Sequence, residues 1–252
     1  MGYPFFFCYA QEDRRNSLGL AQEDGEQLNY VDEFFDQLCA LVAQRLGISK
    51  KEAGFLDIER NSSGDLWSKK LCNNLSTNAC LVCLVTPGFL RDVNGYCGKE
   101  VQVFLKRHEL LEGDVETLRI LPIYWENVDQ CWLKANESTK ELFQKLHYSL
   151  PGLHDQYPST GLHRIRRCSS KRSYDEYLFA IVDRIVQMIQ EMEPLPPIEE
   201  DLNFEDIESA FQPDPSEVCT VAKDSVSMDD IAPAVEVGPP SSLPGLPGVG
   251  GR

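Results

Sequence analysis

The sequence predicts an α/β protein built on a small, open parallel sheet. Two observations carry this prediction: short, strongly apolar segments recur along residues 1–192, and longer segments with apolar residues at helical spacing separate them. Strands that are apolar throughout and alternate with helices form a parallel sheet covered on both faces. We therefore predict a flavodoxin-like sheet of four to five strands, in which a ligand binds beyond the carboxyl ends of the strands, where the strand order reverses.

Each element follows from a local pattern. Gly47 marks the end of a predicted helix, and Pro122, which lacks an N–H, places its strand at an edge or a bulge of the sheet. The predicted strands are Phe5–Tyr9, Gly54–Ile58, Ala79–Val85 and Arg119–Trp125, and a polar loop is expected after the first. The predicted helices are Tyr30–Gly47, Leu66–Leu75, a segment starting at Tyr96, Ser138–Leu146 and Tyr174–Met192.

The last 60 residues differ in composition from the rest. The chain has 24 basic and 40 acidic residues, a net charge of −16, and residues 193–252 account for −11 of it and for ten of the 15 prolines. Such a segment buries too little apolar surface to offset the entropy of ordering. We predict a domain over residues 1–192 and a disordered, acidic, Pro/Gly-rich tail over residues 193–252. Within the tail, Leu202–Phe211 has a short apolar pattern that could fold on a partner protein.

Composition also narrows the class of function. The acidic net charge disfavours nucleic-acid binding, which needs clustered Lys and Arg. The sequence has no secretory signal and no apolar run of about 18–20 residues that would span a membrane. The nine cysteines lie mostly in apolar runs, which indicates reduced thiols, and Cys80 and Cys83 lack the second Cys/His pair of a zinc site. We expect a cytoplasmic protein with no metal, no cofactor and no membrane or nucleic-acid partner.

Motifs in a fixed order give the chain a resemblance to TIR (Toll/interleukin-1 receptor and resistance protein) domains. The resemblance runs from about Tyr3 to Met192, and it departs from the family at Cys8 and Ala10. The third-box Phe-Trp of receptor TIR domains is absent, which argues against an animal receptor adaptor. The family motifs are matched by Phe5–Asp13, Phe55–Trp67, Leu81–Leu90, Tyr96–Glu100 and Ile120–Ile123, and the bacterial TIR-like proteins by Tyr157, Gly161-Leu162 and Tyr174-x-x-Tyr177.

The resemblance implies cleavage of NAD⁺ as a substrate. Many TIR domains break its nicotinamide–ribose bond with a glutamate on the helix after the third strand, and the matching residue is Glu100. The reaction passes through an oxocarbenium-like state and nicotinamide leaves uncharged, so one ionised carboxylate near the ribose would suffice. We expect Glu100 in the first turn of its helix, where the macrodipole favours the ionised form. Without the resemblance, Glu100 would be interpreted as an acid on a solvated helix face.

Further residues near the carboxyl ends of the strands are predicted to bind the substrate. Arg60 would meet a phosphate, Trp67 would stack on a base or on nicotinamide, and Tyr96 would pack over the ribose. Arg60 fits a solvated loop cation equally well, and Trp67 fits a core anchor equally well. The complete predicted set is Tyr9, the backbone of Ala10, Asp57, Arg60, Gly64, Trp67 and Tyr96.

The function remains open between alternatives. The resemblance implies an enzyme of bacterial defence or stress signalling that hydrolyses or cyclises NAD⁺ and is activated by self-association through the loop after the second strand. A non-catalytic TIR module would only assemble with other TIR domains or with partners of the tail. A phospho-receiver domain would need an acid after the third strand, where Thr86-Pro87-Gly88 has none. The sequence lacks the glycine-rich motifs of P-loop NTPases and Rossmann dehydrogenases.

Overall fold

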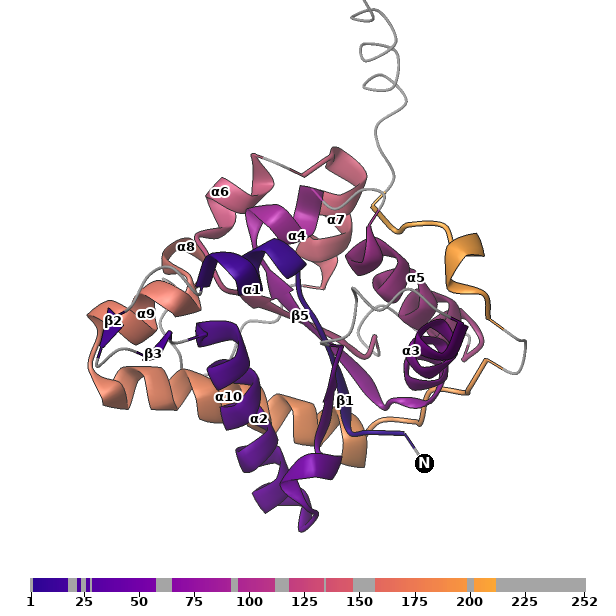
Figure 1. Cartoon of the computed structure of the whole chain (residues 1–252), viewed down its shortest axis with the longest axis horizontal. Helices are drawn as coiled ribbons and strands as arrows, with labels where there is room; N and C mark the ends of the chain where they lie inside the picture. Colours follow the sequence, from indigo (N-terminus) through magenta and orange to yellow (C-terminus); the bar gives the residue numbers. More distant parts are fainter. Residues whose placement is uncertain are drawn as a thin grey trace, which may run out of the picture. The chain divides into compact units, whose positions relative to one another are not determined.

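The computed structural model describes residues 2–17, 22–23, 26–27, 29–57, 65–91, 95–111, 118–133, 135–146, 157–198 and 202–211. Residues 1–214 form one compact unit, whose centre is a parallel sheet with helices on both faces (Figure 1). This confirms the predicted α/β fold class. The predicted disorder of the tail beyond Phe211 concerns residues outside the described ranges.

The sheet has the strand order β4-β1-β5-β6, and each neighbouring pair is parallel. β6 pairs only with β5 among the described strands, so it is an edge strand, as Pro122 indicates. The chain passes from β1 to β4 on one side and then returns to β5 on the other, so the strand order reverses between β1 and β5. The four strands are β1 (Phe5–Cys8), β4 (Gly54–Leu56), β5 (Cys80–Val85) and β6 (Ile120–Tyr124).

One face of the sheet is covered by α2 (Tyr30–Leu46) and α10 (Lys171–Gln190), which pack on each other. The side chain of Asn29 accepts hydrogen bonds from the first amides of α2, and Gly47 ends that helix at a φ of 67°, a left-handed conformation that glycine adopts without strain. The ring of Phe7 lies 5.5 Å from the ring of Phe35, which joins α2 to the central strand.

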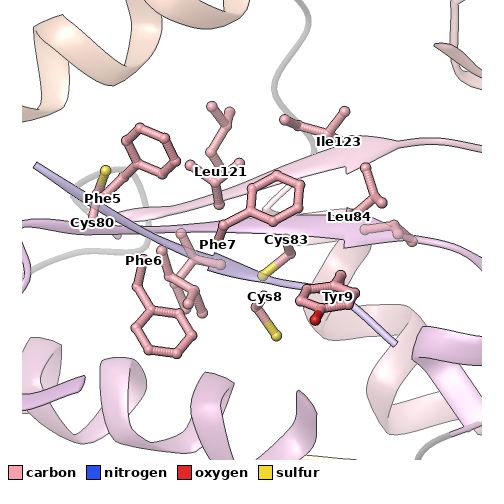
Figure 2. Packing of buried hydrophobic residues seen from close by; sticks show 14 of the residues in the cluster. Phe5, Phe6, Phe7, Cys8, Tyr9, Cys80, Cys83, Leu84, Leu121 and Ile123 are labelled. Carbon is pink, nitrogen blue, oxygen red and sulfur yellow. The ribbon is translucent and has the colours of Figure 1, made fainter. Parts of the chain in front are cut away.

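The other face is covered by α3 (Asp65–Thr77) and α5 (Tyr96–Glu109), which also contact each other. Phe5 and Phe7 point to one side of β1, whereas Phe6 and Cys8 point to the other (Figure 2). The Cys8 thiol lies 4.0 Å from the carbonyl oxygen of Cys97 on α5, so this second side faces α5. The period-two alternation of a strand therefore supplies both halves of the core.

Shorter elements complete the unit. The polar segment after β1, expected as a loop, is instead a helix, and the amide of Asp13 donates to the carbonyl of Ala10 at its start. Polar residues carry no apolar period, so the sequence pattern gave no sign of this helix. These elements are α1 (Gln11–Ser17), β2 (Gln22–Glu23), β3 (Glu26–Gln27), η1 (Lys50–Glu52), α4 (Pro87–Arg91), α6 (Val128–Trp132), α7 (Glu137–Lys145), α8 (Tyr157–Thr160) and α9 (Leu162–Cys168).

The domain extends beyond residue 192, where we had placed its end. Arg107 and Arg119 are buried, and their guanidinium groups donate to the carbonyl oxygens of residues 192, 193, 195 and 196. Residues 202–211, which we call the strap, then pack on α4, α5 and α7 through Phe204, Ile207 and Phe211, all of them buried. The strap contains the 3₁₀ turn η3 (Phe204–Asp206). The few apolar side chains of the strap lie at positions that all face the domain. Their burial orders a segment whose average composition predicts disorder.

Candidate functional site

Glu100 lies inside the protein, although an acid on a solvated face was the alternative interpretation. Its side chain has 0% exposure. Burial is the main cause that raises the pKa of Cys8 and of Cys83, and the charge of Glu100 adds to both shifts. Its carboxylate therefore lies near the thiols at the carboxyl end of β1 and in the middle of β5. α5 begins at Tyr96 after the cap residue Gly95, so Glu100 is the fifth helical residue and not part of the first turn.

Two of the predicted substrate-binding residues are joined to each other. The Tyr9 hydroxyl donates to the carbonyl oxygen of Asp57 at 2.9 Å, which links the ends of β1 and β4. Tyr9 and Asp57 are 1% and 3% exposed, and Ala10 beside them is 4% exposed. Tyr9, Ala10 and Asp57 therefore lie at the carboxyl ends of adjacent strands, where a doubly wound sheet binds its ligand, and Glu100 acts on Cys8 at the end of the same central strand.

Tyr96 contacts the strap. Its ring is stacked on Phe204 with the centroids 5.1 Å apart and the planes at 16°. We expected this ring to pack over a ribose, but one of its faces is covered by Phe204. The contact was not predicted, because Leu202–Phe211 was expected to fold on a partner protein and not on its own domain.

The strap also fixes the first turn of α5. The amide of Ala210 donates to the carbonyl oxygen of Gly98, and the Lys99 ammonium donates to the carbonyl oxygens of Phe204 and Glu205, each at 3.1 Å. A Cβ atom on Gly98 would lie 1.9 Å from the Ser209 hydroxyl oxygen, so a larger residue there would displace Ser209 of the strap. The helix that carries Glu100 is thus held by the strap at its N-terminal end.

Three of the predicted site residues are described in part or not at all. Arg60 and Gly64 lie outside the described residues. Trp67 belongs to α3, but the position of its side chain is not described. Their predicted contacts with NAD⁺ stay predictions.

A polar cluster lies beyond the ends of β1 and β5, where the strand order reverses, and the sequence did not single it out. The Thr86 hydroxyl donates to Asp13 at 2.6 Å and also caps α4 by accepting from the amide of Phe89. Burial raises the pKa of Asp13 to about 6, the Thr86 hydrogen bond lowers it, and the charges of Glu12 and Glu126 raise it further. Asp13 and Thr86 are 73 residues apart, so the sequence pattern gave no sign of this contact.

A second cluster lies beyond β6. The His163 ring is stacked on Trp125 at 5.4 Å, and its Nδ1 lies 3.0 Å from a carboxylate oxygen of Glu126. The amide of His163 donates to the Trp125 carbonyl oxygen, which ties α9 to the end of the strand. A single histidine gave no sequence signal for this position.

One further cavity lies away from the carboxyl ends of the strands. This cavity of about 530 Å³ lies at the opposite edge, lined by Gly2, Tyr3, Pro4, Leu46, Ile48 and Glu52, none of them a predicted site residue. The described ranges contain no cluster of three or more His, Cys, Asp or Glu suited to a metal. The eight cysteines described form no disulfide, and seven are buried. No helix within the described ranges has the length and apolar content needed to cross a bilayer.

Fold and site together define a doubly wound parallel α/β domain with a buried carboxylate beside the carboxyl ends of its strands. No protein-family model, no curated protein and no solved structure matches the chain.

Proposed function

We propose that the chain is a TIR-type NAD⁺ nucleosidase that cleaves the nicotinamide–ribose bond with Glu100, is activated by self-association and acts in bacterial defence or stress signalling in the cytoplasm. The observation that carries the proposal is the complete burial of Glu100 on α5. Removing a carboxylate from water is costly, so an acid in the core is uncommon and needs compensating interactions. Groups held in costly environments concentrate at functional sites.

Cleavage of this bond requires few catalytic groups from the protein. As the nicotinamide–ribose bond breaks, positive charge develops on the ribose, and nicotinamide departs as a neutral base. The Glu100 carboxylate would stabilise that charge more strongly in a water-poor site than in solution. Water then adds to the ribose carbon and loses a proton to give ADP-ribose, or a nucleophilic atom of the same molecule adds to give a cyclic product.

Access to Glu100 requires a conformational change. A side chain with 0% exposure does not contact a dissolved nucleotide, so α5 or its neighbours must move before NAD⁺ binds. Activation by self-association fits this requirement, since contacts made only in an assembly can stabilise an opened state.

The same burial favours a second candidate, a non-catalytic TIR module. Such a module would use its surface to bind other TIR domains, and its buried acid would need no access to solvent. The two candidates differ in a single measurable property, turnover of NAD⁺.

The test is nicotinamide release from NAD⁺ by the full-length protein at high concentration, with and without a crowding agent. Glu100→Gln keeps the shape of the side chain and removes its charge, whereas Glu109→Gln makes the same change at the exposed end of the same helix. The proposal expects turnover by wild type and by Glu109→Gln, no turnover by Glu100→Gln, and unchanged circular dichroism in all three. No turnover by wild type in any assembled state would favour the non-catalytic module.

A further inference from the structure

The folded unit contains two runs of opposite charge along its sequence. Residues 157–174 contain five Lys or Arg residues and no Asp or Glu, in a chain with a net charge of −16. Residues 193–211 contain seven Asp or Glu residues and no Lys or Arg. Runs of one sign can give opposite faces of a protein complementary surface charges.

The basic run keeps a free positive surface after its internal pairs are made. Arg166 pairs with Glu33, and Arg172 pairs with Glu176 in its own helix. Arg164, Arg167 and Lys171 remain exposed, and no ion pair to them occurs among the described residues. We call these three residues, on α9 and at the start of α10, the basic patch.

The strap presents the matching negative surface. Glu205, Asp206 and Glu208 are exposed while the apolar residues between them are buried. Glu205 lies 3.9 Å from the Lys99 ammonium, and Asp206 accepts a hydrogen bond from the Asn203 side chain. Because Phe204, Ile207 and Phe211 anchor the backbone, the three carboxylates are held on a rigid support.

The two surfaces cannot neutralise each other within one molecule. α9 and the start of α10 lie at the left of Figure 1, whereas the strap lies at the right. When a surface on one side of a protein complements a different surface on its opposite side, two copies bind head to tail. Each copy in such a pair still has one unoccupied surface, so further copies can add to the pair.

We propose that the basic patch binds the acidic strap of a second copy of this chain, so that the protein assembles head to tail. The inference gives surfaces to the self-association in the proposed function, but the association itself does not depend on NAD⁺ cleavage. Exposed charge pairs are individually weak and screened by salt, so the assembly forms at high protein concentration and dissolves as salt rises.

The experiment measures the average mass of the full-length protein by sedimentation and light scattering. Raising salt from about 20 mM to about 500 mM shortens the screening length from about 20 Å to about 4 Å. We expect wild type to exceed the monomer mass at low salt and to return to it at high salt, with at least about a tenfold loss of affinity.

Charge reversal distinguishes this contact from general charge effects. The patch variant is Arg164→Glu/Lys171→Glu, and the strap variant is Asp206→Lys/Glu208→Lys. Each variant alone has two surfaces of one sign and should stay monomeric. An equimolar mixture should assemble again as an alternating chain, because each variant then meets the opposite charge on the other.

Matched controls make the same change in net charge elsewhere. Lys51→Glu/Lys69→Glu matches the patch variant and Glu109→Lys/Glu141→Lys matches the strap variant, all four at exposed positions. Both controls should assemble as wild type does. The inference is overturned if wild type is monomeric at every concentration and salt, if either single variant assembles normally, or if the mixture stays monomeric. Thermal melts identify a variant that fails to fold. In that case a milder variant neutralises both surfaces in one chain through Arg164→Gln, Lys171→Gln, Asp206→Asn and Glu208→Gln. This variant should be monomeric, and its assembly would contradict the proposal.

Discussion

Replacing Phe211 by alanine tests whether the strap is part of the folded domain. Phe211 has 0% exposure, and its ring lies 5.4 Å from the ring of Phe89 and 5.8 Å from that of Phe143. Truncating a buried phenylalanine removes apolar contacts and leaves a cavity, which costs about 3–5 kcal/mol. The loss cannot exceed the free energy with which the strap docks, because beyond that value the strap detaches and the rest of the domain remains folded.

We expect Phe211→Ala to lower the free energy of unfolding by about 3 kcal/mol, which corresponds to a Tm lower by about 6–12 °C for a domain of this size. The assay is thermal and urea denaturation followed by circular dichroism. Phe179→Ala is the control, since that side chain on α10 is 46% exposed and its removal should change stability by less than about 1 kcal/mol. Equal, small effects of the two substitutions would refute the conclusion that the strap is packed on the domain.

Three further predictions concern buried polar groups. Burial raises the pKa of Asp13 to about 6, so the stability that its proton contributes is complete below about pH 4 and is lost as pH rises through 6. Asp13→Asn keeps an acceptor for Thr86 and should stabilise the protein by about 1–2 kcal/mol at pH 8 and by nearly nothing at pH 4, as measured by urea denaturation at both values. Tyr9→Phe removes the donor to the Asp57 carbonyl and should cost about 1–2 kcal/mol in the same assay, with an unchanged Tm as the contrary result. Arg107→Lys keeps the charge but cannot reproduce four hydrogen bonds to backbone carbonyls, so a loss of about 2–4 kcal/mol is expected, whereas a loss below 1 kcal/mol would contradict the bonding described.

The sheet and its main helices could be predicted because their information is local. Apolar runs mark all four strands of the parallel sheet, and Pro122 indicates that β6 lies at an edge. Gly47 marks the end of α2 in the left-handed conformation that only a few residue types adopt readily. These signals depend on a few neighbouring residues, so a single sequence contains them.

The features that the sequence did not predict depend on contacts between residues that are distant in the chain. The strap is ordered by Phe204 and Phe211 against α4, α5 and α7, although the composition around them favours disorder. Thr86 contacts Asp13 across 73 residues. The resemblance to TIR domains selects Glu100, but the burial of Glu100 follows from the packing of α5 on the sheet. Its place beyond the first turn follows from the start of that helix at Tyr96.

The central claim is that the Glu100 carboxylate carries NAD⁺ cleavage, and the rate of nicotinamide release by wild type and by Glu100→Gln tests it most directly. Removing a group that stabilises charge in the transition state costs about 100- to 1,000-fold in rate, and an essential acid costs at least that. We therefore predict measurable turnover by assembled wild type and a loss of at least about 100-fold in the folded variant. Equal rates for the two proteins would contradict the assignment of Glu100.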